Sequence, residues 1–321
     1  MRIYYARPIF TPGERDYNTH IEAMIDELGI ERPHWGGKRV YDSCFAGIAP
    51  ANAVLAVLSG AEADDGTSSE IGVFYAMMET DPAKKGIIGL LDDWRTNVDD
   101  EHLQGKGLND LLLGCIQRGG LLVHTPEDAM EQLKVWRGEL EAQGARHGED
   151  TDPSPPGPSP APATASAEAP PLRVYFAGPQ YTPYARAFVA EHAQLLRDEG
   201  MEVYVPRERV RVEPPLLSPE EVFDRDYAAL QGCQAMVALL DGAQPGDATA
   251  LELGFFHGLQ LADARKLGIV GWMTDSRGLR RKDYGYGCNH FPVGLIEESG
   301  AIVESFGKVL YQLSAWRDRS A

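Results

Sequence analysis

The stretch AVLAVLSGAEADDGTSSEIGVF, from Ala53 to Phe74, returns without a gap as AMVALLDGAQPGDATALELGFF, from Ala235 to Phe256. Each copy opens with an uninterrupted apolar run, passes through a loop that carries Gly and Asp, and continues into a helical segment. An apolar run without polar alternation is typical of a strand buried on both faces, as in parallel sheets covered by helices. The stretch therefore predicts a strand, a loop and a helix of an α/β fold, twice in one chain.

The repeat extends beyond this stretch in both directions. KKGIIGLLDDWR (Lys84 to Arg95) matches KLGIVGWMTDSR (Lys266 to Arg277) at the same offset of 182 residues. RIYYARPIFTP (Arg2 to Pro12) matches RVYFAGPQYTP (Arg173 to Pro183) at an offset of 171. A period this long indicates duplicated whole domains rather than a solenoid, whose repeats span about 20–50 residues.

Residues 144–171, between the copies, are rich in Pro, Ala, Ser and Gly and show no apolar period. Such a segment cannot bury a core and predicts an extended, semi-stiff linker. We therefore expect one domain at 1–143 and another at 172–321. A helical stretch, Thr19 to Leu28 or Ala185 to Glu199, follows the first strand of each domain. This alternation predicts two tandem doubly wound parallel-sheet domains of the flavodoxin-like or Rossmann-like kind.

The chain of 321 residues carries 30 Lys and Arg against 48 Asp and Glu, a formal net charge of −18. A polyanion meets a repulsive field at such a surface, so we expect neither a nucleic-acid polymer nor a membrane as a partner. The four cysteines lack metal-binding spacing, and no apolar stretch is long enough for a signal peptide or a membrane span. The sequence predicts reduced thiols, no metal and a cytoplasmic location.

The loop after the second apolar run carries the candidate chemistry, since ligands of such sheets bind beyond the carboxyl ends of the strands. It contains neither a P-loop nor G-x-G-x-x-G, so we expect no phosphate cradle. Asp247 is placed to cap a helix from Ala248 to Leu261, where the positive helix end favours an ionised Glu252. A firmly held carboxylate between apolar neighbours can act as a nucleophile, although Asp247 is equally well explained as an ordinary cap. The same spacing returns in the first copy as Asp65 and Glu70.

An ordered set of motifs resembles the nucleoside 2-deoxyribosyltransferases. The motifs are Tyr175 to Pro179, Phe223 to Asp226, Asp247-x-Thr-x-x-Glu252-Leu-Gly, Asp275-Ser276-Arg277, Asn289 and Gly294 to Glu297. Each is weak alone. Together they cover nearly all of residues 173–316 and, more loosely, 2–137.

The resemblance implies an enzyme of nucleotide salvage that transfers 2-deoxyribose between bases by a retaining double displacement, with no cofactor. Its substrates are deoxynucleosides and free nucleobases. The residue matching Glu252 attacks C1′ and holds a deoxyribosyl ester, as carboxylates do in retaining glycosidases. The remaining matches are Tyr175, which orients the nucleophile; Asp226 and Asp247, which handle base binding and protonation; Gly178 and Asp241, at substrate-binding positions; and Asn289, which reaches a neighbouring subunit's site to bind the sugar.

The first copy retains Tyr4, Asp65, Glu70 and Asn109 but differs elsewhere. Cys44 stands where the second copy has Asp226, Ser59 where it has Asp241, and Arg7 where it has Gly178. We therefore expect a weakened or inactive amino-terminal site. The tandem chain is expected to form an intramolecular pseudo-dimer in which Asn109 completes the site of Glu252. A further homo-oligomer is an alternative.

Two other functions fit the same motifs. One is hydrolysis of nucleosides or nucleoside 5′-monophosphates; the other is non-catalytic nucleotide sensing, which the intact carboxylate set disfavours. Arg207, Arg209 and Arg211 alternate on one face of an expected strand. We interpret them as a solvated edge, with a 5′-phosphate site as the alternative.

Overall fold

Two parallel β-sheets form the framework of the computed structural model, which describes residues 1–33, 37–60, 62–93, 108–147, 170–206, 208 and 217–320. The first sheet has the order β1-β2-β3-β4, with β1 at Ile3–Ala6, β2 at Ala53–Val57, β3 at Gly86–Leu90 and β4 at Gly120–Val123. The second has the order β6-β5-β7-β8-β9, with β5 at Arg173–Ala177, β6 at Glu202–Tyr204, β7 at Ala235–Leu239, β8 at Gly268–Trp272 and β9 at Ala301–Val303. The predicted α/β fold in two repeats is confirmed.

The order of the second sheet is that of flavodoxin-like folds, in which the second strand lies outside the first. In the first sheet this edge is an isolated bridge between Arg2 and Glu31, which matches the pairing of Arg173 with Glu202. Pro33 follows the bridge and cannot donate a ladder hydrogen bond. Within the described residues, the edge is thus a strand in one half and a single bridge in the other.

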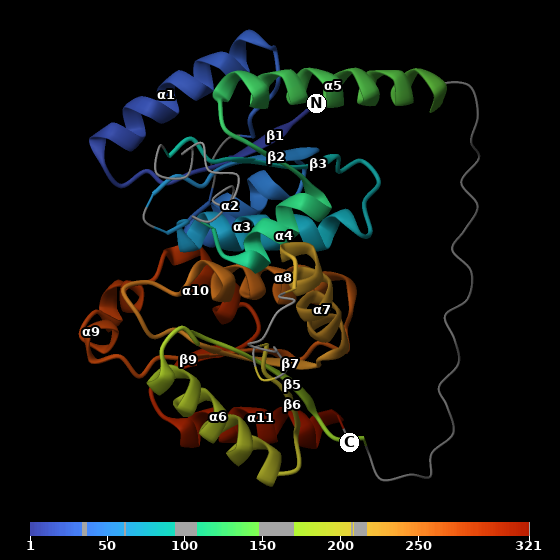
Figure 1. The fold of residues 1–321 in the computed structure, drawn as a ribbon. Coiled ribbons are helices and arrows are strands. Elements are labelled where there is room, and N and C mark those ends of the chain that lie inside the picture. The colour runs from blue at the N-terminus through green and yellow to red at the C-terminus, as the bar shows by residue number, and fades with distance from the viewer. Residues whose placement is uncertain are drawn as a thin grey trace.

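Helices cover both faces of each sheet (Figure 1). The first half has α1 (Pro12–Glu27), α2 (Val40–Ile48), α3 (Asp65–Met78), α4 (Asp110–Gly119) and α5 (Pro126–His147). The second has α6 (Pro183–Asp198), α7 (Pro219–Gly232), α8 (Asp247–Ala262), α9 (Ser276–Leu279), a 3-10 turn η1 (Lys282–Gly287), α10 (His290–Glu297) and α11 (Phe306–Ser320). Helices α1 and α5 lie on the outer face of the first sheet and α6 and α11 on that of the second, while α2, α3, α4, α7, α8 and α10 lie between the sheets (Figure 1).

The first helix begins earlier than its apolar spacing predicts. Thr11 accepts a hydrogen bond from the Glu14 N–H at 3.2 Å, and the Glu14 carboxylate accepts one from the Thr11 N–H at 2.7 Å. This capping box, with Pro12 at the first helical position, starts α1 ahead of Thr19. Apolar periodicity misses these turns because most of their side chains are polar.

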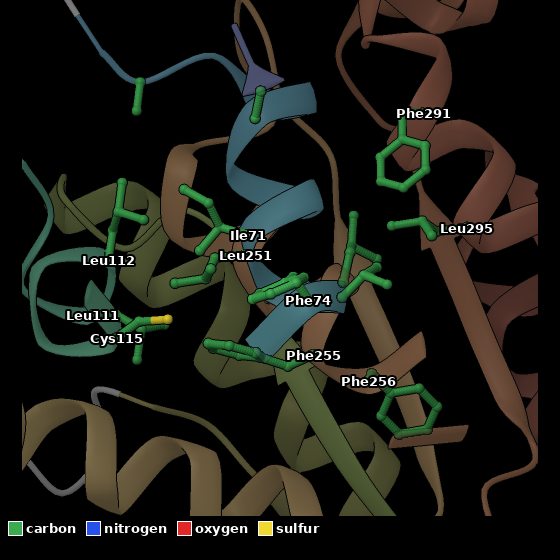
Figure 2. Close-up of a cluster of buried hydrophobic side chains, with 14 of the residues drawn as sticks. Ile71, Phe74, Leu111, Leu112, Cys115, Leu251, Phe255, Phe256, Phe291 and Leu295 are labelled. Atoms are coloured by element: carbon green, nitrogen blue, oxygen red, sulfur yellow. The ribbon is translucent and has the colours of Figure 1, made fainter. Parts of the chain in front are cut away.

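The two halves share one hydrophobic core, built where α3 packs against α8 (Figure 2). Ile71 and Phe74 of α3 lie in this core with Leu251 and Phe255 of α8, and all four side chains are fully buried. A helix that is buried around most of its circumference belongs inside a protein rather than on its surface. The predicted pseudo-dimer is therefore the arrangement of the halves in this structure.

Glycine allows these two helices to approach each other closely. A Cβ atom added to Gly254 would lie 2.1 Å from the Ser69 carbonyl oxygen and 2.9 Å from the Gly72 Cα. Because the nearest atoms belong to the backbone, a side chain could be accommodated only if the helices moved apart. The crossing brings the amino-terminal ends of both helices to the interface.

Other predictions fall partly outside the described residues. Helix α5 extends to His147, so the first residues of the predicted linker are helical, and 148–169 are not described. All four cysteines are buried free thiols. In the described ranges, no helix combines the length and apolarity that a membrane span requires.

Candidate active site

Tyr175 and Glu252 form a buried pair beneath the carboxyl edge of the second sheet. Strand alternation directs Tyr175 toward α8, while Val174 and Phe176 face the outer core. The Tyr175 hydroxyl donates a hydrogen bond of 2.6 Å to Glu252 Oε1. Only 3% of Glu252 is exposed, because α8 lies between its own sheet and α3.

The surroundings of Glu252 favour its protonated form. Burial raises the pKa of Glu252 to about 8, the Tyr175 hydrogen bond lowers it, and the negative charges of Asp226 and Asp247 raise it. The expected stabilisation of an ionised Glu252 by the helix end is therefore outweighed by desolvation, which penalises a buried charge. At neutral pH this carboxyl group is therefore mostly protonated.

Asp247 is the first residue of α8, and the N-cap is Gly246. The expectation that Asp247 itself caps the helix is therefore off by one position. Its carboxylate accepts hydrogen bonds from the Ala248 N–H at 2.7 Å and, across the interface, from the Asn109 N–H at 3.4 Å. Burial, with the nearby Glu62 carboxylate, raises the pKa of Asp247 to about 6.

Asn109 enters this site from the other half of the chain. It caps α4, where its side-chain oxygen accepts a hydrogen bond from the Leu111 N–H at 2.9 Å. Its amide nitrogen donates to the Tyr181 hydroxyl at 2.7 Å. The interface thus places an asparagine of the first half beside the carboxylates of the second.

A third carboxylate, Asp226 on α7, is held by two neighbours. Asp226 Oδ1 accepts hydrogen bonds from the Tyr204 hydroxyl at 2.6 Å and Arg225 Nε at 2.8 Å, and Oδ2 accepts one from Arg225 Nη2 at 2.8 Å. The Tyr204 ring stacks on Tyr175 with 5.4 Å between ring centroids. Asp226 is therefore linked to the Tyr175 and Glu252 pair through two stacked rings.

These groups surround a pocket of about 370 Å³. Its lining includes Asn109, Gly178, Arg225, Asp226 and Glu252.

Asp241 lies outside this lining. It accepts hydrogen bonds from the Thr274 N–H at 2.6 Å and the Asp275 N–H at 2.8 Å, and it lines a neighbouring hollow. Asp241 thus joins the loops after β7 and β8, and the substrate contact expected of it stays a prediction.

The first half repeats part of this geometry. The Tyr4 hydroxyl donates to Glu70 Oε1 at 2.5 Å, and the Asn289 N–H donates to Asp65 Oδ2 at 2.9 Å. Burial raises the pKa of Glu70 and of Asp65 to about 7. Asn289 thus lies at the site of the other half, as expected for a residue that reaches a neighbouring site, and Asn109 lies at the site of Glu252.

The two sites differ in the contacts that their asparagines make. The amino-terminal site also lacks one carboxylate. The Asn289 side chain bonds Asp64, whereas the Asn109 amide reaches Tyr181. Cys44 is buried and hydrogen-bonds with Tyr4 and Glu70. No carboxylate replaces the missing aspartate at that position.

Sequence reasoning missed Tyr204, Tyr181 and the pocket role of Arg225. Arg225 stands beside the recognised Asp226, but Tyr204 and Tyr181 carried no signal of their own, because their positions depend on strand pairing and the interface. Arg207, Arg209 and Arg211 lie outside the described residues. Among the residues that are described, no group of three or more His, Cys, Asp or Glu side chains could hold a metal ion.

Known proteins resemble parts of this chain. A family model described as nucleoside 2-deoxyribosyltransferase matches residues 3–109 and 174–312. A conserved protein from Enterococcus faecalis V583 is similar at 22% identity and a TM-score of 0.38, and a 2-desoxiribosyltransferase from Leishmania mexicana at 17% and 0.34. Each comparison covers 45% of this chain and 98% of the other. No curated protein matches the chain.

The family match spans most of the chain and falls on both copies of the fold. It supports an enzyme of the glycosyltransferase type. The chain belongs to the nucleoside 2-deoxyribosyltransferase family, as a tandem duplication of the family's domain.

Proposed function

We propose that the second half, residues 172–321, transfers 2-deoxyribose between nucleobases through a covalent ester on Glu252. The observation that carries this proposal is the 2.6 Å hydrogen bond from Tyr175 to a buried Glu252 that lines the pocket. A carboxylate directed into a pocket and oriented by a second side chain is the arrangement of an activated nucleophile.

The reaction follows in two displacements at C1′. An oxygen of ionised Glu252 forms a bond to C1′ while the bond from C1′ to the base nitrogen breaks and its electron pair leaves with the base. In the second step, a nitrogen of the incoming base attacks C1′ and the ester bond breaks, which regenerates the Glu252 carboxylate. Two inversions give net retention.

Protons balance within the pocket. Because burial raises the pKa of Glu252 to about 8, its carboxyl group holds a proton that it must lose. The departing base nitrogen must gain one proton in the first step, and the incoming base nitrogen must lose one in the second. The neighbouring carboxyl groups, Asp226 and Asp247, are the acid and base groups placed to assist this transfer.

Asn109 is proposed to bind the sugar, beside Asp247. Their hydrogen bond joins the two halves, and the Asn109 side chain lies in the lining of the pocket. An amide offers both a donor and an acceptor to a sugar hydroxyl. Each half therefore supplies part of the same site.

The amino-terminal half is proposed to be a degenerate copy. Its Tyr4 and Glu70 pair is intact, but Cys44 replaces the aspartate that faces the base in the other site. A buried thiol is a poor hydrogen-bond acceptor and does not substitute for a carboxylate. We expect little or no transfer there.

Chromatography of the purified protein with deoxyinosine and free adenine tests the proposal. We expect deoxyadenosine to form with the wild type, to disappear with Glu252→Gln, and to persist with the matched variant Glu70→Gln. Hypoxanthine released at the same rate with or without adenine would indicate hydrolysis instead. Loss of activity in Glu70→Gln alone would assign the reaction to the other half.

A further inference from the structure

Tyr204, Arg225 and Asp226 form one hydrogen-bonded cluster in the wall of the Glu252 pocket. The Arg225 guanidinium contacts both Asp226 oxygens at 2.8 Å, and Tyr204 supplies a third hydrogen bond at 2.6 Å. The Asp226 side chain is 3% exposed and that of Arg225 is 24% exposed. Two bonds from one planar guanidinium fix the carboxylate in orientation as well as in charge.

The first half shows that the fold does not require this cluster. Strand pairing aligns Tyr204 with Pro33, and the 182-residue offset aligns Arg225 with Ser43 and Asp226 with Cys44. All three cluster members are therefore replaced in the first half. This half nevertheless forms a parallel sheet, and its helix α3 packs against α8 of the second half. The tyrosine and glutamate pair, by contrast, occurs in both halves. Replacement as a set indicates that the three residues share one function.

Charge distinguishes Arg225 from the rest of the lining. Among the described residues that line the pocket, it is the single cation, and Asp110, Asp226 and Glu252 carry acidic groups. A guanidinium has five N–H donors. Two of them bind Asp226, and Nη1, which is buried, has no hydrogen-bond partner within the described part of the chain. Arg225 thus retains donors after it has bound Asp226.

We propose that Arg225 is a specificity-determining residue that binds the carbonyl oxygen of an oxo-substituted nucleobase, while Asp226 accepts a hydrogen bond from the adjacent ring N–H. This inference rests on the proposed function and names its substrate class. Hypoxanthine, guanine, uracil and thymine present such an edge. Adenine presents an amino group and a ring nitrogen without hydrogen at the corresponding positions.

Hydrogen bonding alone would accept adenine in a turned orientation, so the discrimination comes from charge. When the bond from C1′ to the base breaks, its electron pair passes into the ring system of the base. In an oxo-substituted base this negative charge is shared by the carbonyl oxygen, which faces the guanidinium. A fixed positive group at the point where charge develops lowers the barrier more than it strengthens ground-state binding.

The test compares deoxyinosine with deoxyadenosine as donors, with one common acceptor base, in the wild type and in Arg225→Met. We expect the wild type to prefer deoxyinosine in kcat/KM. Arg225→Met should lower kcat/KM for deoxyinosine by at least about tenfold and change deoxyadenosine much less. Arg225→Gln keeps a hydrogen-bond donor for Asp226 but removes the charge, so it should show the same loss of preference for deoxyinosine. This variant tests the proposal even if the Met variant folds poorly.

Arg118→Met is the matched control. Arg118 makes an equivalent two-nitrogen contact with Asp224, at 3.0 and 2.5 Å, but lies outside the pocket lining. We expect its ratio of the two donors to equal that of the wild type. Equal losses for both donors in Arg225→Met, or an unchanged ratio, would overturn the inference.

Binding of free bases separates this inference from the proposed function. If the wild type transfers deoxyribose from neither donor, the proposed function fails. Calorimetry with hypoxanthine and adenine then decides the role of Arg225. Weaker binding of hypoxanthine by Arg225→Met than by the wild type supports the inference. An affinity for hypoxanthine that is the same in both proteins overturns it.

Discussion

The backbone N–H of Asn109 donates a hydrogen bond to Asp247 Oδ2 across the interface between the halves, at 3.4 Å. The reciprocal contact, from Asn289 to Asp65, measures 2.9 Å. Each half therefore supplies the other with an asparagine at the amino-terminal end of the helix that carries its glutamate. A duplicated chain can in this way complete two sites within one molecule.

Substitution of the two asparagines should separate the two sites. Serine keeps the helix cap but removes the amide, so Asn109→Ser and Asn289→Ser should have similar stability. We expect Asn109→Ser to raise KM or lower kcat of deoxyribosyl transfer about tenfold or more, since a hydrogen bond to the substrate is lost. Asn289→Ser should leave transfer unchanged. Steady-state kinetics that show the opposite pattern would assign the reaction to the Glu70 site.

The pH dependence of transfer should reflect the burial of Glu252. Its pKa is raised to about 8, and attack requires the ionised form, so kcat/KM should rise with pH through about 8. The Tyr175 hydrogen bond lowers this pKa. Tyr175→Phe should therefore move the rising limb to higher pH, whereas Tyr4→Phe should not. A limb near the ordinary glutamate value would show that Glu252 is solvated.

The repeats and the parallel sheets could be predicted from the sequence, and strand and loop order placed Glu252 and Asp247 at one sheet edge. The positions of Tyr175 and Asp226 were expected only from the family resemblance. The crossing of each asparagine to the other half was expected only from the family resemblance, which has this residue reach a neighbouring subunit's site. Asn109 and Asn289 exchange halves through the packing of α3 against α8, and sequence offsets do not show which half an exposed loop faces. The hydrogen bonds that Asp241 accepts from the Thr274 and Asp275 N–H groups could not be predicted from the sequence either.

The carboxyl group of Glu70 should make stability depend on pH. Its pKa is raised to about 7 in the folded protein from an ordinary 4.5, so the folded state binds the proton more tightly. The associated stability is present at low pH and is lost as pH rises between these values. Glu70→Gln stays neutral and can still accept the Tyr4 hydrogen bond, so it should raise the thermal midpoint at pH 8 and change it little at pH 4.5.

The expected gain for Glu70→Gln at pH 8 is on the order of 3 kcal/mol, at roughly 1.4 kcal/mol for each unit of pKa. Thermal unfolding of both proteins at several pH values measures the difference. A variant that is less stable than the wild type at pH 8 would contradict the pKa assigned to Glu70.

The close crossing of α3 and α8 should make Gly254 intolerant of any side chain. A Cβ at this position would lie 2.1 Å from the Ser69 carbonyl oxygen, so Gly254→Ala should force the helices apart and destabilise the protein by about 1–3 kcal/mol. Helix propensity alone would instead favour alanine by about 1 kcal/mol. Gly138→Ala, in α5 with nothing within 4 Å of its added Cβ, isolates that propensity term and should be stabilising.

Transfer activity should also depend on the close packing of α3 against α8. Separation of the helices should move Asn109 away from Asp247, because α4 and α8 belong to different halves of the chain. Gly254→Ala should therefore lose transfer activity at temperatures where it is still folded, as judged by circular dichroism, while Gly138→Ala keeps it. Full activity in a folded Gly254→Ala protein would mean that the second half completes its site without the first.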